Sequence, residues 1–405
     1  MSNMLNITPR RRVGVAIVGM GGAVATTAAA GLEVLRRGTN RMDGLPLAHV
    51  AVPGLAAYED LELEGWDLNA QSLAEAAAEH GVLQGGQLKE VEAALDAKHP
   101  WKAVGSREFC RNIEGRNLNA TAGHRAAIAA IQDDLQRFRE ANGFDGLVMV
   151  NLASTERTPA SSPAHRSIEA FEKALDADDA SIGPAMLYAY AAIMAGVPYG
   201  NFTPSCAAEV PALSQLSQQR RVPVAGKDGK TGQTLMKTVL APALRARALH
   251  VDGWFSTNIL GNRDGEALQD PDSLKSKLGT KGSVLDSILG YPVEDHIVDI
   301  RYYRPRGDDK EAWDNIDVTG FLGQRMQIKV NFLCKDSVLA APLAIEIARV
   351  LDLAQQRGEG GAQEQLSLFF KAPQTASGQP EHSFPAQERM LHEWLHAPGS
   401  QPAAE

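Results

Sequence analysis

The chain contains 405 residues, of which 44% are hydrophobic and 22% charged, and it carries a formal net charge of −9. This length exceeds the usual limit for one hydrophobic core, and 37 glycines imply many tight connections, so we expect two structural units of mixed α/β class. Because the balance is acidic and no apolar run is long enough to cross a bilayer, we expect neither nucleic acid nor membrane as a partner, while a locally basic pocket for a phosphorylated metabolite stays compatible.

The number and spacing of the cysteines indicate the cellular compartment of the protein. Cys110, Cys206 and Cys334 are odd in number and widely separated, which is typical of a reducing environment and offers no disulfide framework. Basic residues precede an apolar run near the N-terminus, but that run enters glycines and no small-residue cleavage site follows, so we expect no signal peptide. We therefore predict a cytoplasmic protein.

The first predicted elements are a strand, a glycine turn and a helix. Residues 13–18 form a β-branched run, Gly19, Gly21 and Gly22 follow it, and an alanine-rich helical stretch comes next. In this order the glycines let the backbone approach a pyrophosphate, and the helix N-terminus supplies unpaired N–H groups. Val24 stands where the dinucleotide fingerprint has its last glycine, so a turn that only packs helix on strand remains the alternative.

A carboxylate and a polar cluster extend this predicted site. Asp67 is the candidate to bind a ribose hydroxyl pair, although it lies further downstream than the simple βαβ spacing predicts. Residues 70–136 are largely helical and polar in pattern and indicate little chemistry. The strand predicted at 147–150 is followed at once by polar side chains, and parallel sheets bind ligands at that edge. These side chains are Asn151, Ser154, Thr155 and Glu156.

The middle of the chain changes its pattern. A buried helix is predicted at 185–197, and a short strand at 222–226 leads into the glycine-rich turn GKDGKTGQT. This turn lacks the upstream glycine spacing of a P-loop, which disfavours a nucleotide triphosphatase. An amphipathic helix then precedes three half-buried strands, which we expect to be antiparallel, at 250–262, 294–305 and 325–334. A further helix begins at Asp336–Ser337, and GEGGAQEQ, residues 358–365, is expected to be a surface loop.

Several lysines gather in motifs near glycines. Lys277 and Lys281 are four positions apart and share a side if their segment forms one helical turn. Lys310 follows a predicted strand, and Lys371 ends an apolar run. Each lysine by itself is more often a solvated charge, but burial would make it a proton acceptor and a phosphate or enolate would hold it charged.

The motifs NILGNRDG, LKSKLGTKGSVLD, YYRPRGDDK, LCKDS and FFKAP follow GKDGKTGQT in the chain. In order and spacing they resemble the inositol-3-phosphate synthase family, and the resemblance covers most of the chain, most specifically from about residue 148. It implies the conversion of D-glucose 6-phosphate into 1D-myo-inositol 3-phosphate with tightly held NAD, by oxidation at C5, enolisation, aldol closure and reduction. Such chemistry needs cations beside developing oxyanions and a proton acceptor, which accounts for crowded lysines.

The resemblance also implies roles for individual residues. The catalytic candidates are Lys277, Lys281, Lys310, Lys371, Asp228 and Asp336. The substrate-binding candidates are Thr231, Gly232, Gln233, Asn258 and Asn262. The candidates for contact with NAD are Gly19, Gly21, Gly22, Asp67, Asp264 and Asp308.

The resemblance implies a fold and an assembly as well. We expect a Rossmann-like NAD-binding unit over residues 1–235 that resumes at 337–405, with a catalytic and oligomerisation unit, largely an antiparallel sheet, at 236–336. A homotetramer is the family's expected state. Relatives of eukaryotic type have two asparagines and a glycine where this chain has Ala23, Val24 and Ala25, so side-chain contacts to the pyrophosphate are missing. A cyclase for another hexose phosphate, a simple NAD-dependent sugar-phosphate dehydrogenase and a non-catalytic sensor remain alternatives.

Overall fold

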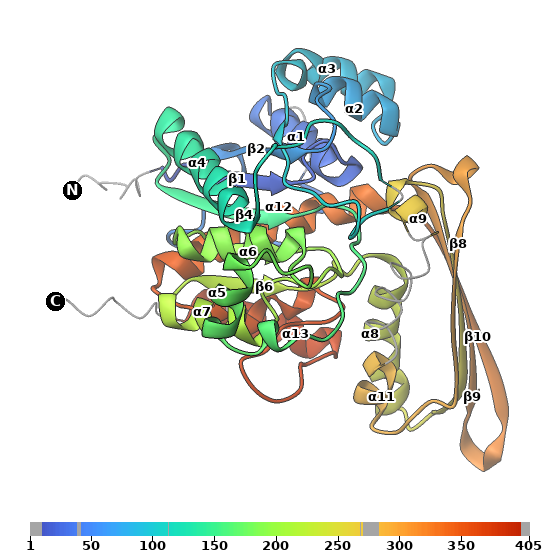
Figure 1. Ribbon diagram of the computed structural model, residues 1–405. Helices are drawn as coiled ribbons and strands as arrows, with labels where there is room; N and C mark the ends of the chain where they lie inside the picture. The colour runs from blue at the N-terminus through green and yellow to red at the C-terminus, as the bar shows by residue number, and fades with distance from the viewer. Residues whose placement is uncertain (1–9, 39–41, 112, 268, 270–282, 398–405) are drawn as a thin grey trace, which may run out of the picture.

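The computed structural model describes residues 10–38, 42–111, 113–267, 269 and 283–397 (Figure 1). It contains a seven-stranded sheet of order β11-β6-β5-β4-β1-β2-β3 and a four-stranded sheet of order β10-β9-β7-β8. The mixed α/β class predicted from the sequence is confirmed. No helix in the described part of the chain combines the length and apolar character needed to cross a membrane.

Every strand pair in the seven-stranded sheet is parallel. Its strands are β1 (Val13–Val18), β2 (Leu61–Asp67), β3 (Trp101–Lys102), β4 (Gly146–Asn151), β5 (Tyr199–Asn201), β6 (Pro223–Gly226) and β11 (Gly361–Ala362). Strand β1 pairs with β2 on one side and β4 on the other, so the strand order reverses beside β1. In open parallel sheets, ligands bind outside the carboxyl ends of the strands at such a reversal.

Helices cover both faces of this sheet because its central strands are buried on both sides. One face carries α1 (Ala23–Arg36), with α2 (Leu73–His80) and α3 (Gly85–Asp96) against it, and α12 (Asp336–Gln356). The other face carries α4 (His124–Asn142), α5 (Ile168–Asp176), α6 (Pro184–Met194) and α7 (Pro211–Arg220).

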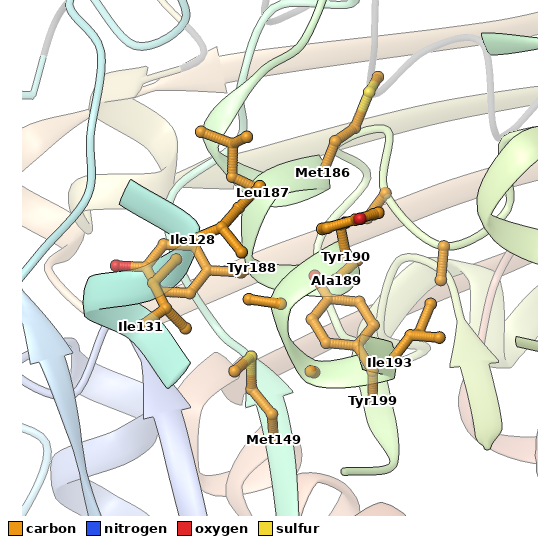
Figure 2. Packing of buried hydrophobic residues seen from close by; sticks show 14 of the residues in the cluster. Ile128, Ile131, Met149, Met186, Leu187, Tyr188, Ala189, Tyr190, Ile193 and Tyr199 are labelled. Carbon is orange, nitrogen blue, oxygen red and sulfur yellow. The ribbon is translucent and has the colours of Figure 1, made fainter. Parts of the chain in front are cut away.

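Helix α6 confirms the buried helix expected at 185–197. Ten of its 11 residues are buried, so it has no polar face. Figure 2 shows its Tyr188 with Ile128 and Ile131 of α4 and with Met149 of β4 in one apolar core. This core fixes the carboxyl end of β4 against the rest of the sheet.

The four-stranded sheet follows in the chain. Its strands are β7 (His250–Leu260), β8 (Asp295–Tyr302), β9 (Asp309–Thr319) and β10 (Arg325–Lys335). Helices α8 (Gly232–Ala246) and α11 (Ser283–Leu289) lie along one face of the sheet, and the short α9 (Arg263–Ala267) lies near one end of it (Figure 1). The first two pairs in the order, β10–β9 and β9–β7, are antiparallel, but β7–β8 is parallel.

Two expectations for this sheet are therefore wrong. Strand β8 runs parallel to β7, and β9 was absent from the predicted strands. The inward side of β9 alternates correctly, with Ala312, Ile316 and Val318 buried, but Lys310 and Asp314 occupy inward positions too. Polar residues at buried positions hide the period-two pattern by which a strand is recognised.

Two further expectations, one of a loop and one of a helix, are also wrong. Residues 358–365 are not simply a surface loop, because β11 pairs with β6 and the 3₁₀ helix η5 (Glu364–Phe369) follows it. Residues 70–136 were expected to be largely helical, but residues 97–111 and 113–123 form no helix, and several of them line a cavity described below. The helix expected at Asp336–Ser337 is confirmed as α12, which returns the chain to the seven-stranded sheet.

Candidate active site

One cavity connects the glycine turn after β1 with the edge of the four-stranded sheet. Gly19, Gly22 and Asp67 are among the residues that line it at the carboxyl edge of the parallel strands. Asp228, Thr231, Asn262, Lys310, Asp336 and Lys371 also line it. The cavity therefore brings together candidates that are up to about 350 positions apart in the chain.

The glycine turn has a backbone that side chains would obstruct. Gly19 has φ +91°, and a Cβ there would lie 2.9 Å from the Ala153 backbone. Gly22 is the N-cap of α1, and no side chain caps that helix. Its N-terminal N–H groups therefore face the turn without a side-chain partner, which is the arrangement that binds phosphate.

Asp67 contacts the same turn. Its Oδ2 accepts the Gly21 N–H at 2.9 Å, and its Oδ1 accepts the Asn69 N–H at 3.0 Å. A Cβ on Gly21 would lie 3.1 Å from Asp67 Cγ, so only glycine allows this approach without a shift. The carboxylate is thus held at the cavity wall, where it was predicted to meet the cofactor ribose.

Sequence reasoning missed the wall opposite this turn. Val104, Gly105, Leu118 and neighbouring residues of the segments 103–110 and 113–118 line the cavity. Asn117 fixes this segment, since its Nδ2 donates to the Asp67 and Trp101 carbonyls at 3.0 Å each and its N–H donates to the Leu68 carbonyl at 2.9 Å. His80 was missed as well; its Nε2 lies 2.8 Å from the Gly21 carbonyl oxygen. The contacts are largely with backbone, which leaves no residue-type signal in the sequence.

A buried ion pair joins the loop after β6 to the C-terminal segment. Lys371 Nζ donates to Asp228 Oδ1 at 2.7 Å, and the two residues are 7% and 3% exposed. The Lys371 N–H also donates to the Asp228 carbonyl at 2.7 Å. Backbone and side-chain hydrogen bonds therefore join the same two residues, Lys371 and Asp228.

A second lysine–carboxylate pair lies where β9, β10 and α12 meet. Lys310 Nζ donates to Asp336 Oδ1 at 3.1 Å, and the Thr231 hydroxyl donates to the same oxygen at 2.9 Å. Lys310 is 8% exposed. Two candidate catalytic residues and one candidate substrate residue thus form a single hydrogen-bonded unit on the cavity.

Asp308 has a different local role. Its carboxylate accepts the Ser337 N–H at 3.1 Å and the Ser337 hydroxyl at 2.6 Å, so it caps α12. Burial raises its pKa. It is not among the residues lining the cavity, and its predicted contact with NAD stays a prediction. Its capping role leaves the Asp336 carboxylate for Lys310 and Thr231.

The remaining substrate candidates lie beside the second pair. Asn258 Nδ2 donates to Gln233 Oε1, and both residues are almost fully buried. Asn258 Oδ1 has no hydrogen-bond partner among the described residues. Gly232 begins α8, and a Cβ there would lie 3.8 Å from Lys310 Cε. Asn262 lines the cavity and accepts the Gly265 N–H on Oδ1 at 3.1 Å.

Three candidates are not located by the structure. Lys277 and Lys281 lie outside the described residues. Asp264 belongs to α9, but its side chain is not described. Their predicted roles stay predictions.

Glu156 is the titratable member of the polar cluster after β4. Its Oε1 accepts the Ala185 N–H at the start of α6 at 3.0 Å, and the residue lines the cavity. Burial of the carboxyl group raises its pKa to about 8, against the opposing effect of that hydrogen bond. A carboxyl group whose pKa is raised by burial therefore lies on the cavity wall.

Comparison with known proteins shows the family to which the chain belongs. A family model described as myo-inositol-1-phosphate synthase, an NAD-binding family, matches residues 45–396. Inositol-3-phosphate synthase 1 of Bacteroides thetaiotaomicron is 42% identical over 407 residues, which cover 95% of this chain and 95% of that protein. Inositol-3-phosphate synthase of Saccharomyces cerevisiae is 30% identical over 381 residues, which cover 84% of this chain and 71% of that protein.

Solved structures give the same fold. The inositol-3-phosphate synthase of Caenorhabditis elegans superposes with a TM-score of 0.88 at 22% identity, over 98% of this chain and 91% of that one. A myo-inositol-1-phosphate synthase-related protein from Thermotoga maritima gives a TM-score of 0.80 at 26% identity, over 95% of this chain and 98% of that one.

Proposed function

Because this chain belongs to the myo-inositol-1-phosphate synthase family, we propose that it is the isomerase that converts D-glucose 6-phosphate into 1D-myo-inositol 3-phosphate with NAD as cofactor. One observation carries the proposal. A single cavity is lined both by the glycine turn after β1 and by the pairs Lys371–Asp228 and Lys310–Asp336. A dehydrogenase without ring closure has no use for two lysine–carboxylate pairs beside its cofactor.

The residues at the turn fit NAD. The backbone of Gly19, Gly21 and Gly22 and the uncapped N-terminus of α1 would hold the pyrophosphate, and Asp67 would accept from a ribose hydroxyl. Gly19 has no space for a Cβ, and a Cβ on Gly21 would crowd Asp67, as expected where the backbone itself is the ligand-facing surface. When bound, NAD supplies reversible hydride transfer, so substrate and product have the same oxidation state.

The two buried pairs supply the charge chemistry. A buried ammonium can stabilise an oxyanion that develops on a sugar carbon, and its carboxylate partner fixes the position of the ammonium before the substrate arrives. Lys310 and Lys371 are placed in this way by Asp336 and Asp228. Thr231, at the start of α8, lies where a helix N-terminus would hold the substrate phosphate. We propose that Gly232, Gln233, Asn258 and Asn262 complete the substrate side and that Lys277 and Lys281 add further cations.

Product analysis tests this function. Purified protein with D-glucose 6-phosphate and a catalytic amount of NAD should give inositol 3-phosphate, identified by phosphorus and proton NMR, without net NADH. Stoichiometric NADH would instead establish a sugar-phosphate dehydrogenase. A different cyclic phosphate would establish a related cyclase.

We also propose that the two sheets mark two structural units. The seven-stranded sheet takes its strands from residues 13–226 and 361–362, and the four-stranded sheet takes its strands from 250–335. These ranges support boundaries at 1–235 with 337–405 for the NAD-binding unit and 236–336 for the catalytic and oligomerisation unit. Limited proteolysis that releases a stable fragment cut elsewhere would contradict these boundaries.

The outer face of the four-stranded sheet supports a homotetramer. Phe255, Ile297 and Leu333 point to this face and are 37%, 50% and 59% exposed. Exposed apolar side chains gathered on one sheet are typical of subunit interfaces. Light scattering that gives the mass of a monomer at micromolar concentration would contradict the assembly.

We propose a cytoplasmic location. Cys110, Cys206 and Cys334 are all described, and none of them forms a disulfide. Scattered thiols of this kind are typical of reducing compartments. Fractionation of cells that express the native chain tests this.

A further inference from the structure

Lys230 lies in the loop between β6 and α8, between the two residues that reach the catalytic pairs. Asp228, two positions earlier, holds Lys371, and Thr231, the next residue, holds Asp336. Asp228, Gly229 and Thr231 line the cavity, whereas Lys230 does not, and it is only 3% exposed. Asp228, Gly229 and Thr231 therefore lie on the cavity, whereas the Lys230 side chain is buried away from it.

The Lys230 side chain ends against the C-terminal helix α13 (Phe384–His396). Its Nζ donates to Gln387 Oε1 and lies 5.6 Å from the centre of the Phe384 ring. Gln387 is fully buried, and its Nε2 donates to the Glu381 carbonyl at 2.6 Å. The described residues place no carboxylate within ion-pair distance of this ammonium, so the amide oxygen is its acceptor.

Burying a lysine whose hydrogen-bond partner is neutral destabilises the folded protein, so such a lysine suggests a functional role. Burial lowers the pKa of Lys230 to about 7. A residue that served only to fill this space would be more stable as an apolar side chain, because burying a cation without a counter-charge is unfavourable. The hydrogen bond to Gln387 thus indicates a role that packing alone does not explain.

Backbone contacts connect this lysine to the catalytic segment. The Lys230 N–H donates to the Phe369 carbonyl at 2.8 Å, and the Lys371 N–H donates to the Asp228 carbonyl at 2.7 Å. Gly229 and Phe370 form an antiparallel bridge between these bonds. The loop and residues 369–371 are therefore joined by backbone hydrogen bonds, and the Lys230 side chain connects this unit to α13.

We propose that Lys230 is a positioning residue for the reaction described above: its hydrogen bond to Gln387 clamps the loop against α13 and so holds Asp228 and Thr231 in place. Through those two residues the clamp fixes Lys371 and the Asp336–Lys310 pair. Lys230 does not face the cavity and is not a catalytic residue. The proposal rests on the proposed function for its kinetic test, but not for its structural test.

The test uses Lys230→Met, Gln387→Met and the double variant in the full chain. The first leaves the Gln387 oxygen unpaired, the second leaves the ammonium unpaired, and the double variant removes both polar groups. We expect each single variant to lose about 10- to 10²-fold in kcat, with the KM for glucose 6-phosphate and the affinity for NAD nearly unchanged. The double variant should lose no more than the worse single variant, because the two residues act as one contact.

Hydrogen exchange supplies a readout that does not depend on activity. The backbone amides of Lys230 and Lys371 should exchange faster in both single variants than in the wild type. Lys98→Met is the matched control, because Lys98 is another partly buried lysine, bonded to Glu62 and to the Leu63 carbonyl at 3.2 Å, far along the chain from this loop. It should lower the melting temperature without changing kcat or exchange at residues 227–231.

The outcomes separate the two proposals. Wild-type kcat and unchanged exchange in Lys230→Met would overturn the clamp, as would a kcat loss matched by an equal loss of NAD binding and folding. If Lys230→Met does not fold, Gln387→Met decides by the same two measurements. If the wild type makes no inositol phosphate, the proposed function fails, and the exchange rates alone decide whether the clamp exists.

Discussion

Lys310 and Asp336 are joined at 3.1 Å between Nζ and Oδ1, although one lies in strand β9 and the other begins helix α12. The register of β9 and β10 explains the contact, because Lys310 pairs with Cys334, two positions before Asp336. The next pair along the same strands, Asp309 and Lys335, forms a half-exposed salt bridge at 2.8 Å. The buried pair Lys310–Asp336 thus lies at the cavity, and the solvated pair Lys335–Asp309 lies beside it. Variants of the solvated pair therefore serve as controls for variants of the buried pair.

We predict that Asp336→Asn keeps the fold but lowers kcat by about 10²-fold, because an amide still accepts from Thr231 but no longer holds the Lys310 ammonium by charge. Steady-state kinetics and thermal melting measure the two effects. Asp309→Asn removes the matching surface carboxylate and should leave both unchanged. A lowered melting temperature with normal turnover would leave Asp336 a structural role only.

We predict that Lys310→Ala and Lys371→Ala each fold, bind NAD and lose about 10²–10³-fold in rate, since each removes a positioned cation. Lys335→Ala removes an exposed lysine from the position after Cys334 and should leave the rate nearly unchanged. The same loss is expected for Lys277→Ala and Lys281→Ala. Near-normal turnover of both Lys277→Ala and Lys310→Ala at saturating glucose 6-phosphate would refute the proposed mechanism.

We predict that Asp67→Ala weakens NAD binding and narrows the preference for NAD over NADP, because a carboxylate at the ribose repels a 2′-phosphate. The variant also loses the acceptor of the Gly21 N–H. Calorimetric titration with each cofactor measures the change, with Asp133→Ala, an exposed carboxylate on α4, as the control. Equal affinities of the wild type for NAD and NADP would contradict the assignment.

We predict that Glu156 makes the protein less stable as pH rises. Its pKa is about 8 in the folded protein and near 4.5 when exposed, so between these values the folded state holds a proton that the unfolded state has released. This contribution to stability is complete below the lower value and is lost as pH rises through the upper one. The melting temperature of Glu156→Gln, which keeps an acceptor for the Ala185 N–H, should therefore fall less than that of the wild type between about pH 5 and about pH 9. Parallel curves would show that the carboxyl group is equally solvated in both states.

The sequence predicted those parts of the site whose residue types are dictated by local geometry or chemistry. Gly19 and Gly21 could be predicted because a glycine turn between a strand and a helix is a local pattern, and the structure shows that a Cβ would clash with the Ala153 backbone at Gly19 and crowd Asp67 at Gly21. Lys310 and Lys371 were predicted as site residues because the motifs GDDK and KAP resemble motifs of the family, and the structure places both on the cavity. Each of these signals lies within a few positions of the chain.

The remainder depends on contacts between distant segments. Strand β9 was missed because it carries the buried Asp314, whose Oδ1 accepts from Trp254 Nε1 at 2.7 Å and from Ser256 Oγ at 2.6 Å, side chains on another strand. The division of work between Asp308 and Asp336 was equally hidden, because it depends on which carboxylate reaches Ser337. Likewise, the burial of Lys230 depends on α13, which begins more than 150 positions later in the chain.

The place of β11 at the edge of the parallel sheet has a consequence for biosynthesis. The other six strands of that sheet lie before residue 227, so a ribosome finishes them more than 130 residues before Gly361 and Ala362 are added. Throughout that interval one side of β6 offers unpaired N–H and C=O groups, and such edges pair readily with other chains. A nascent chain that stalls before residue 361 therefore carries an open strand edge, and we expect it to be prone to aggregate. Chaperone demand for this protein should be greatest while its second sheet is being synthesised.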